Sequence, residues 1–217
     1  MILRNDDMFR ILYSNTAALI RQKNARRPMI TALSAAAFLI LLLSPRIIPA
    51  PVDSSEIKPL LKGDFAPAVT LISIGNLKEA AVNFNPASSA SIKLPALVWF
   101  WFISCENCVR DMKFMGQLHK KYASELSLIA VNVDAPEERG TVKNFIENNR
   151  IASYQNYFDK ITQTPFSRAY EASDKFGVTS TPAVFIIDKT GRIAWRAENN
   201  INFDELEDYI ETVLGER

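Results

Sequence analysis

The stretch that decides the fold runs from residue 97 to residue 108 and reads Leu-Val-Trp-Phe-Trp-Phe-Ile-Ser-Cys-Glu-Asn-Cys. Its first seven residues are apolar, which is typical of a fully buried strand. The segment that follows, Val109 to Ala123, has the periodicity of a helix with one apolar face. The position of Cys-x-x-Cys between a strand and the N-terminus of a helix indicates a dithiol/disulfide site. Helix-end amides and the positive end of the helix dipole stabilise a thiolate at the first cysteine.

Cys105 and Cys108 are the only cysteines among the 217 residues. Their spacing of three residues lets the two sulfurs form a disulfide and break it again. Half of a zinc site is an alternative, but tetrahedral zinc needs four ligands and the chain has one histidine, His119. A purely structural disulfide would close too short a loop to stabilise the fold much. We therefore predict a redox pair, with no metal and no cofactor.

A second apolar stretch lies near the N-terminus, where no charged residue occurs from Pro28 to Pro45. As a helix it would be roughly 27 Å long, marginally enough to cross the hydrocarbon core. A basic cluster at residues 21–27 precedes it and places the N-terminus in the cytoplasm. A cleaved signal peptide is the alternative, but the best cleavage site, after Ala50, fits the expected small-residue pattern poorly. We predict an uncleaved single-pass anchor, with the cysteine pair on the periplasmic or extracytoplasmic side, where disulfides persist.

The chain is thereby divided into four parts. We expect a cytoplasmic tail at residues 1–27, a transmembrane anchor at 28–48, a linker at 49–63 and a single domain at 64–217. The formal net charge of +1 gives no reason to expect nucleic-acid binding.

Strands and helices alternate within the expected domain. Thr141 is expected to cap the second helix, and Asn202 with Glu205 resembles a capping box that opens the last one. This order predicts an α/β domain with a mixed central sheet flanked by helices. Strands are expected at 69–74, 80–84, 97–103, 126–133, 155–158, 183–187 and 192–197, and helices at 109–123, 141–149, 167–175 and 202–214.

This order resembles the thioredoxin fold, with Cys-x-x-Cys after the first core strand and Thr181-Pro182 just before a later strand. The chain most resembles the membrane-anchored TlpA/ResA-like thiol–disulfide oxidoreductases, over about residues 65 to 214. The resemblance implies that Pro182 is cis and faces the cysteine pair. It also implies that Thr181 offers backbone groups to an extended, cysteine-bearing peptide. The residues that carry the resemblance are Phe100-Trp101, Cys105, Cys108, Asp111, Val131-Asn132-Val133-Asp134, Phe176-Gly177-Val178, Thr181-Pro182, Phe185-Ile186-Ile187-Asp188 and Gly191-Arg192-Ile193.

The chain departs from the pattern of such proteins at four positions near the cysteines. Ser104 stands where the family usually has tryptophan, and Asn107 where it often has proline. Trp99 replaces the buried aspartate of generic thioredoxins, and Lys113 stands where a proline commonly kinks the active-site helix. These changes leave the dithiol chemistry in place and bear on partner choice and redox potential.

The residues around the cysteines suggest distinct roles. We expect Cys105 to be the nucleophile that forms a mixed disulfide with a partner, and Cys108 to resolve it. Glu106 disfavours the neighbouring thiolate, which favours a reductant over a strong oxidant. Asp111 follows Cys108 by three residues on the same helical face and could exchange a proton with it. The alternative for Asp111 is a solvated carboxylate in the first helical turn.

The sequence therefore predicts an extracytoplasmic, membrane-anchored thiol–disulfide oxidoreductase that reduces disulfides of cysteine-containing proteins. By resemblance, apocytochrome c is one candidate partner, and electrons come from a membrane or extracytoplasmic thiol donor. A disulfide-forming oxidant and a non-catalytic binding module remain alternatives. Copper delivery is disfavoured because no histidine follows His119, and a peroxidase because Phe102 occupies the position where peroxidatic sites usually carry threonine.

Overall fold

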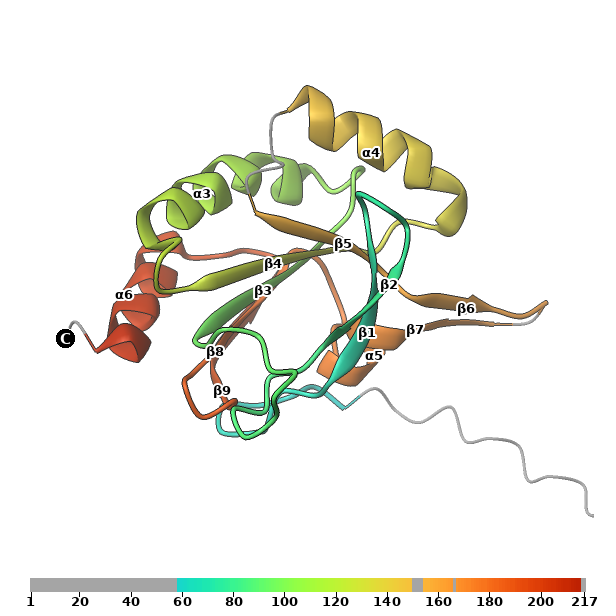
Figure 1. The fold of residues 1–217 in the computed structure, drawn as a ribbon. Helices are drawn as coiled ribbons and strands as arrows, with labels where there is room; N and C mark the ends of the chain where they lie inside the picture. Colours follow the sequence, from blue (N-terminus) through green and yellow to red (C-terminus); the bar gives the residue numbers. More distant parts are fainter. Residues whose placement is uncertain (1–57, 150–153, 166, 216–217) are drawn as a thin grey trace, which may run out of the picture. The chain divides into compact units, whose positions relative to one another are not determined.

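A seven-stranded mixed sheet in the order β2-β1-β5-β4-β3-β8-β9 forms the centre of a computed structural model that describes residues 58–149, 154–165 and 167–215 (Figure 1). A second sheet consists of β6 and β7. The α/β class and the mixed strand directions are as predicted. The strands are β1 Val69–Ser73, β2 Glu79–Val82, β3 Ala96–Trp101, β4 Ser127–Asn132, β5 Gln155–Asp159, β6 Ile161–Gln163, β7 Arg168–Tyr170, β8 Ala183–Ile187 and β9 Ile193–Glu198, and the helices are α3 Glu106–Tyr122, the 3₁₀ turn η1 Pro136–Glu138, α4 Arg139–Asn148, α5 Glu171–Phe176 and α6 Phe203–Leu214.

The expected tail and anchor, and the linker as far as residue 57, lie outside the described residues. In the part of the chain that the structure describes, no helix has the length and apolar character needed to span a membrane.

The predicted central strand is confirmed as β3, all six residues of which are buried. It pairs in parallel with β4 and antiparallel with β8. Successive side chains of a strand point to opposite faces of its sheet, so β3 contributes to two cores. Leu97, Trp99 and Trp101 belong to one apolar cluster, whereas Val98 and Phe100 belong to the other.

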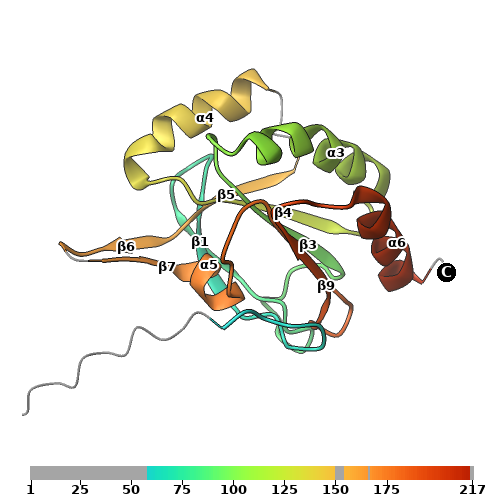
Figure 2. The same cartoon turned by 180° about the vertical axis from the view of Figure 1, so that it is seen from behind.

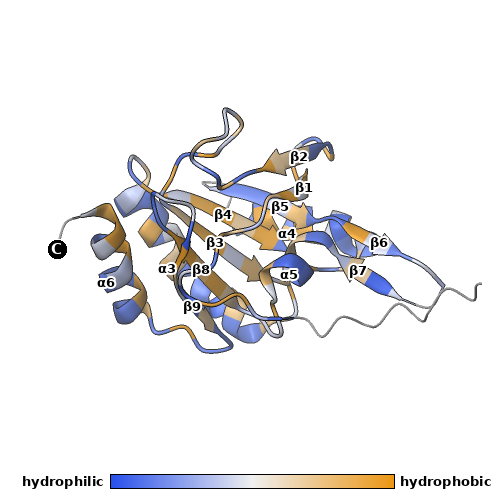
Figure 3. Ribbon diagram, turned by 90° about the horizontal axis from the view of Figure 1, so that it is seen from below, coloured by the Kyte–Doolittle hydropathy of each residue, from blue (hydrophilic) through white to orange (hydrophobic). Residues whose placement is uncertain are grey.

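Helices cover both faces of the sheet. Buried side chains of α3, α4 and α6 join the cluster that contains Trp99 and Trp101, so these three helices cover one face. Buried residues of α5 join the cluster on the opposite face. Figures 1 and 2 show α3 and α4 on the side of the sheet away from α5. Figure 3 shows apolar residues gathered on the central strands and on the helix sides that face them.

Two helix starts differ from the predictions. α3 begins at Glu106, before the expected start at Val109, because Cys105 itself is the N-cap and its sulfur accepts the Cys108 N–H. α4 begins at Arg139, so Thr141 lies inside the helix and is not its cap. The 3₁₀ turn that starts at Pro136 runs directly into α4, and proline is well suited to open such a turn.

The expected helix at residues 167–175 is wrong in its first part. Arg168–Tyr170 form β7, which pairs with Ile161–Gln163, and the helix α5 starts only at Glu171. The carboxylate of Asp159 accepts the N–H groups of Ala172 and Ser173, which defines the first turn of α5.

The last helix starts as predicted, because the Asn202 side chain accepts the Glu205 N–H at 3.3 Å. The capping box is only half formed. Glu205 does not reach back to Asn202; its carboxylate accepts the indole N–H of Trp195 at 3.0 Å.

Residues before the expected domain boundary at residue 64 also pack against the domain. Gly63 N–H donates to the Ile193 carbonyl at 2.8 Å, and Arg196 donates to the Leu60 carbonyl at 2.8 Å. Residues 60–63, assigned to the linker from composition, therefore lie against β9.

Candidate active site

The two cysteines form a disulfide at the N-terminus of α3. The Cys105 sulfur accepts the Cys108 N–H at 3.1 Å, and the Cys105 carbonyl accepts the Val109 N–H at 3.0 Å. Cys105 is 8% exposed, whereas Cys108 is fully buried. Of the two cysteines, Cys105 is therefore the one that a sulfur of a partner can approach from solvent. The amide hydrogen bond and the end of a 17-residue helix both favour negative charge on the Cys105 sulfur.

Asp134, two residues after the end of β4, contacts the loop that precedes Cys105. Its Oδ2 accepts the backbone N–H of Ile103 at 2.9 Å and the side-chain amide of the fully buried Asn132 at 2.7 Å. From the sequence, Asn132 and Asp134 stood out only through the family resemblance. Their local signal is a pair of polar residues at the carboxyl end of a buried strand that neighbours the cysteine-bearing strand.

Asp111 lies inside the protein, which rules out a solvated carboxylate. Its side chain is 1% exposed, and its Oδ1 accepts the Arg110 Nε–H at 3.1 Å. Oδ2 is buried and has no hydrogen-bond partner among the residues that the structure describes. Burial raises the pKa of the Asp111 carboxyl above its ordinary value, and the contact with Arg110 offsets part of that rise. Asp111 shares one buried face of α3 with Cys108.

Thr181-Pro182 lies next to β3, the strand that leads to Cys105. The peptide bond is cis, as the resemblance implied. Ala183 of β8 is opposite Phe100 of β3, so the residues just before Ala183 lie beside the end of β3, where the chain continues to Cys105.

A groove of about 340 Å³ opens beside residues 179–182, which form the groove edge. Apolar and polar side chains from several parts of the fold line it. The lining residues are Phe102, Val133, Tyr170, Ser173, Asp174, Val178, Thr179, Ser180 and Thr181.

Glu198, at the end of β9, fixes the conformation of the groove edge. Its Oε2 accepts the hydroxyl hydrogens of Thr179 at 2.6 Å and of Ser180 at 3.0 Å. Its other oxygen is paired with Arg196. The Glu198 side chain is only 11% exposed, so water competes little for these contacts. Glu198 has no local sequence signal, because only the β8–β9 hairpin brings it next to residues 179 and 180.

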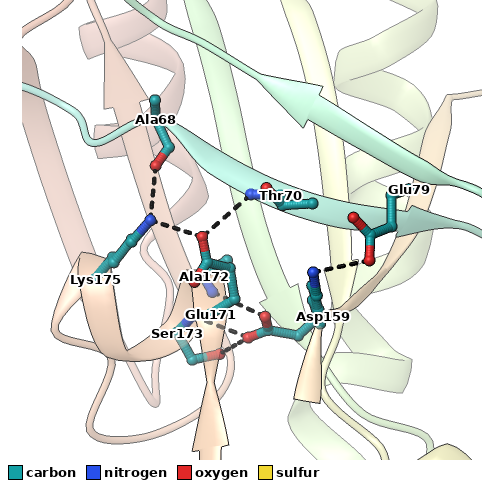
Figure 4. Close-up of polar contacts among 9 residues, drawn as sticks. Ala68, Thr70, Glu79, Asp159, Glu171, Ala172, Ser173 and Lys175 are labelled. Atoms are coloured by element: carbon teal, nitrogen blue, oxygen red, sulfur yellow. Dashed lines mark hydrogen bonds and ion pairs between the residues drawn. The ribbon is translucent and has the colours of Figure 1, made fainter. Parts of the chain in front are cut away.

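A polar cluster anchors α5, from which the groove edge extends (Figure 4). The buried Asp159 carboxylate accepts two backbone N–H groups and the Ser173 hydroxyl, at 2.7 to 2.9 Å. Lys175 bridges from Glu171 at 2.6 Å to the Ala68 carbonyl at 3.1 Å. The helix then ends at Gly177, whose φ of 64° is in the left-handed region that favours glycine.

The remaining candidates lie apart from this centre or at its rim. Glu106 is exposed in the first turn of α3, beside Cys105. His119 is partly buried near the other end of α3, with its ring against Tyr154. Within residues 58–149, 154–165 and 167–215, no group of three or more His, Cys, Asp and Glu residues is arranged to hold a metal ion.

Comparison with known proteins agrees with this geometry. ResA, a thiol-disulfide oxidoreductase of Bacillus thuringiensis subsp. konkukian, is 26% identical over 114 residues, which cover 52% of this chain and 60% of ResA. YkuV, a thiol-disulfide oxidoreductase of Bacillus subtilis, is 28% identical over 123 residues, 56% of this chain and 78% of YkuV. The matched part thus spans less than two thirds of the length of ResA.

A solved structure from Chlorobium tepidum, titled as a thiol:disulfide interchange protein DsbE, superposes with a TM-score of 0.57 at 25% identity. The match covers 72% of this chain and 99% of that one. The sequence profile of the AhpC/TSA family matches residues 63–196, which include both cysteines and Pro182. The chain therefore belongs to the AhpC/TSA family, with a thioredoxin-like fold.

Proposed function

We propose that this chain is an extracytoplasmic, membrane-anchored thiol–disulfide oxidoreductase that reduces disulfides of partner proteins through Cys105 and Cys108. The observation that carries the proposal is the disulfide at the N-terminus of α3, in which Cys105 is the more exposed of the two cysteines. The names of ResA, YkuV and the DsbE structure support the same chemistry.

The reaction starts from the dithiol form. The Cys105 thiolate attacks one sulfur of the partner disulfide, and the other partner sulfur leaves as a thiolate. The Cys108 sulfur, after giving up its proton, attacks Cys105 and releases the second partner thiol. Two electrons pass to the partner, and the Cys105–Cys108 disulfide remains. A thiol donor must then reduce this disulfide before the next cycle.

Asp111 supplies the proton chemistry of the buried cysteine in this scheme. Cys108 must lose a proton when it attacks and regain one when the disulfide is reduced. Cys108 is fully buried, so bulk water cannot readily exchange that proton. Burial raises the pKa of this carboxyl, on the same helical face as Cys108, above its ordinary value, so it holds a proton more readily than an ordinary aspartate does.

Thr181 is the proposed contact for the partner backbone. An extended peptide that lies along residues 180–182 would present its cysteine to Cys105, and a neighbouring apolar side chain would enter the groove formed by Phe102, Val133 and Val178. Apocytochrome c is a candidate partner of this kind, proposed only from the resemblance of the sequence to TlpA/ResA-like proteins.

The location is proposed from sequence. The basic cluster before residue 28 and the uncharged apolar stretch after it support an anchor with the catalytic domain outside the cytoplasm.

The direct test uses the full-length chain in mild detergent and follows the reduction of insulin disulfides with dithiothreitol as the electron source. Cys105→Ser is expected to abolish catalysis. Cys108→Ser keeps the attacking thiol and serves as the matched control, because it should still form mixed disulfides. Full activity in Cys105→Ser would refute the proposed function.

A further inference from the structure

Asn107, which lies between the two cysteines, contacts a segment far away in sequence. Its side-chain amide donates to the Asn199 carbonyl at 3.1 Å. The contact links the first turn of α3 to the loop after β9. Asn107 is half-buried, at the N-terminal end of α3.

Asn199 passes this contact on to the groove edge. Its backbone N–H donates to the Pro182 carbonyl at 2.8 Å, while its own carbonyl accepts from Asn107. Asn199 adopts a φ of 67°, in the left-handed region, which asparagine tolerates better than most residues. Two hydrogen bonds, both made by the backbone of Asn199, thus connect the first turn of α3 to Pro182.

The residue before Asn199 also contacts the groove edge, at residues 179 and 180. Glu198, directly before Asn199, accepts the hydroxyl hydrogens of Thr179 and Ser180. Residues 198 and 199 therefore contact residues 179, 180 and 182. Asn199 also accepts the hydrogen bond from Asn107, which lies in the first turn of the helix that follows Cys105.

We propose that Asn107 is a positioning residue that sets the cysteine-bearing turn of α3 against the partner-binding edge at residues 179–182. This inference rests on the proposed function. A protein partner must engage the edge and Cys105 at the same time, so its reaction depends on their relative placement. A small disulfide needs only access to the Cys105 sulfur. Its reaction therefore does not depend on how Cys105 is placed relative to residues 179–182.

The test compares two substrates in single-turnover reactions of the reduced, full-length chain in detergent. The probes are insulin and 2-hydroxyethyl disulfide, and the rates are followed by acid quench and thiol alkylation. In Asn107→Ala the rate with insulin is expected to fall about threefold to tenfold, the range that loss of one hydrogen bond spans. The rate with 2-hydroxyethyl disulfide should stay within about twofold of wild type, so the ratio of the two rates changes.

Asn149→Ala is the matched control. It removes another asparagine amide-to-carbonyl bond, 2.8 Å long, from the Phe145 carbonyl at the end of α4. Its ratio of rates should equal that of wild type. Asn107→Asp, which replaces the donor by an acceptor facing a carbonyl, should lower the ratio at least as much as Asn107→Ala.

Three outcomes overturn the inference. An unchanged insulin rate in Asn107→Ala shows that the bond does not matter for partner engagement. Equal losses with both substrates show that Asn107 acts on the cysteines alone. A wild-type chain that does not reduce insulin removes the proposed function, and the inference with it.

Discussion

Replacing Asp111 with asparagine should make the protein more stable and its reaction slower. The carboxylate is 1% exposed, Arg110 reaches one of its oxygens, and the other oxygen is buried without a partner among the described residues. Asparagine has nearly the same shape and can still accept from Arg110. It carries no charge, so its burial costs less than burial of the carboxylate.

The size of the effect follows from the buried oxygen. A buried polar group without a hydrogen bond costs about 1–3 kcal/mol, and more when it is charged. The amide keeps part of that cost, so the net gain at pH 7 should be about 1–2 kcal/mol. For a domain of this size, this corresponds to a rise in Tm of about 2–8 °C.

The gain should depend on pH. Burial raises the pKa of Asp111 in the folded state above its unfolded value. The ionised carboxyl therefore destabilises the fold above the folded pKa, and this cost disappears as the pH falls toward the unfolded value of about 3.9. The advantage of Asp111→Asn should be largest at neutral pH and should vanish near pH 4.

Thermal unfolding of the disulfide form at pH 7 and pH 4 measures this dependence, and quenched-flow kinetics measures the attack by Cys108. That step should slow by tenfold or more, because general acid–base groups typically contribute at least about a hundredfold and water replaces them only in part. Asp204→Asn, an exposed carboxylate in the first turn of α6, is the matched control and should change neither quantity much. A variant that is less stable than wild type at pH 7, or that resolves mixed disulfides at the wild-type rate, would refute the role assigned to Asp111.

Four further predictions concern the fold, the chemistry and the location. Cys108→Ser should trap mixed disulfides with partner proteins through Cys105, visible on non-reducing gels, because the resolving thiol is gone. The reduction potential, measured against glutathione or dithiothreitol buffers, should lie closer to roughly −270 mV than to roughly −120 mV, and a value above about −180 mV would favour a disulfide-forming oxidant. Gly177→Ala should lower the free energy of unfolding by about 2–4 kcal/mol in urea titrations, because φ is 64° and a Cβ would come within 2.3 Å of the Lys58 carbonyl oxygen. Mass spectrometry of the membrane fraction should find residues 28–48 still attached, and a mature N-terminus beyond them would contradict the uncleaved anchor.

Much of the fold could be predicted because its signals are local. The unbroken apolar run of β3, the one-sided periodicity of α3 and the turn at residues 188–191 each depend on a few adjacent residues. The β6–β7 pair was missed for the opposite reason. Arg168–Tyr170 carry no strong strand pattern, and only their pairing with Ile161–Gln163 makes them a strand.

The candidate site divides in the same way. The sequence by itself determined the cysteine pair at a helix start, the acid three residues after it and the Thr-Pro step before a strand. The tertiary structure alone decided that Asp111 is buried and that Asn107 reaches Pro182 through Asn199. Burial and hydrogen bonds between distant segments depend on how β3, β8 and β9 align in one sheet. No short stretch of sequence carries that alignment, because it results from the packing of the whole domain.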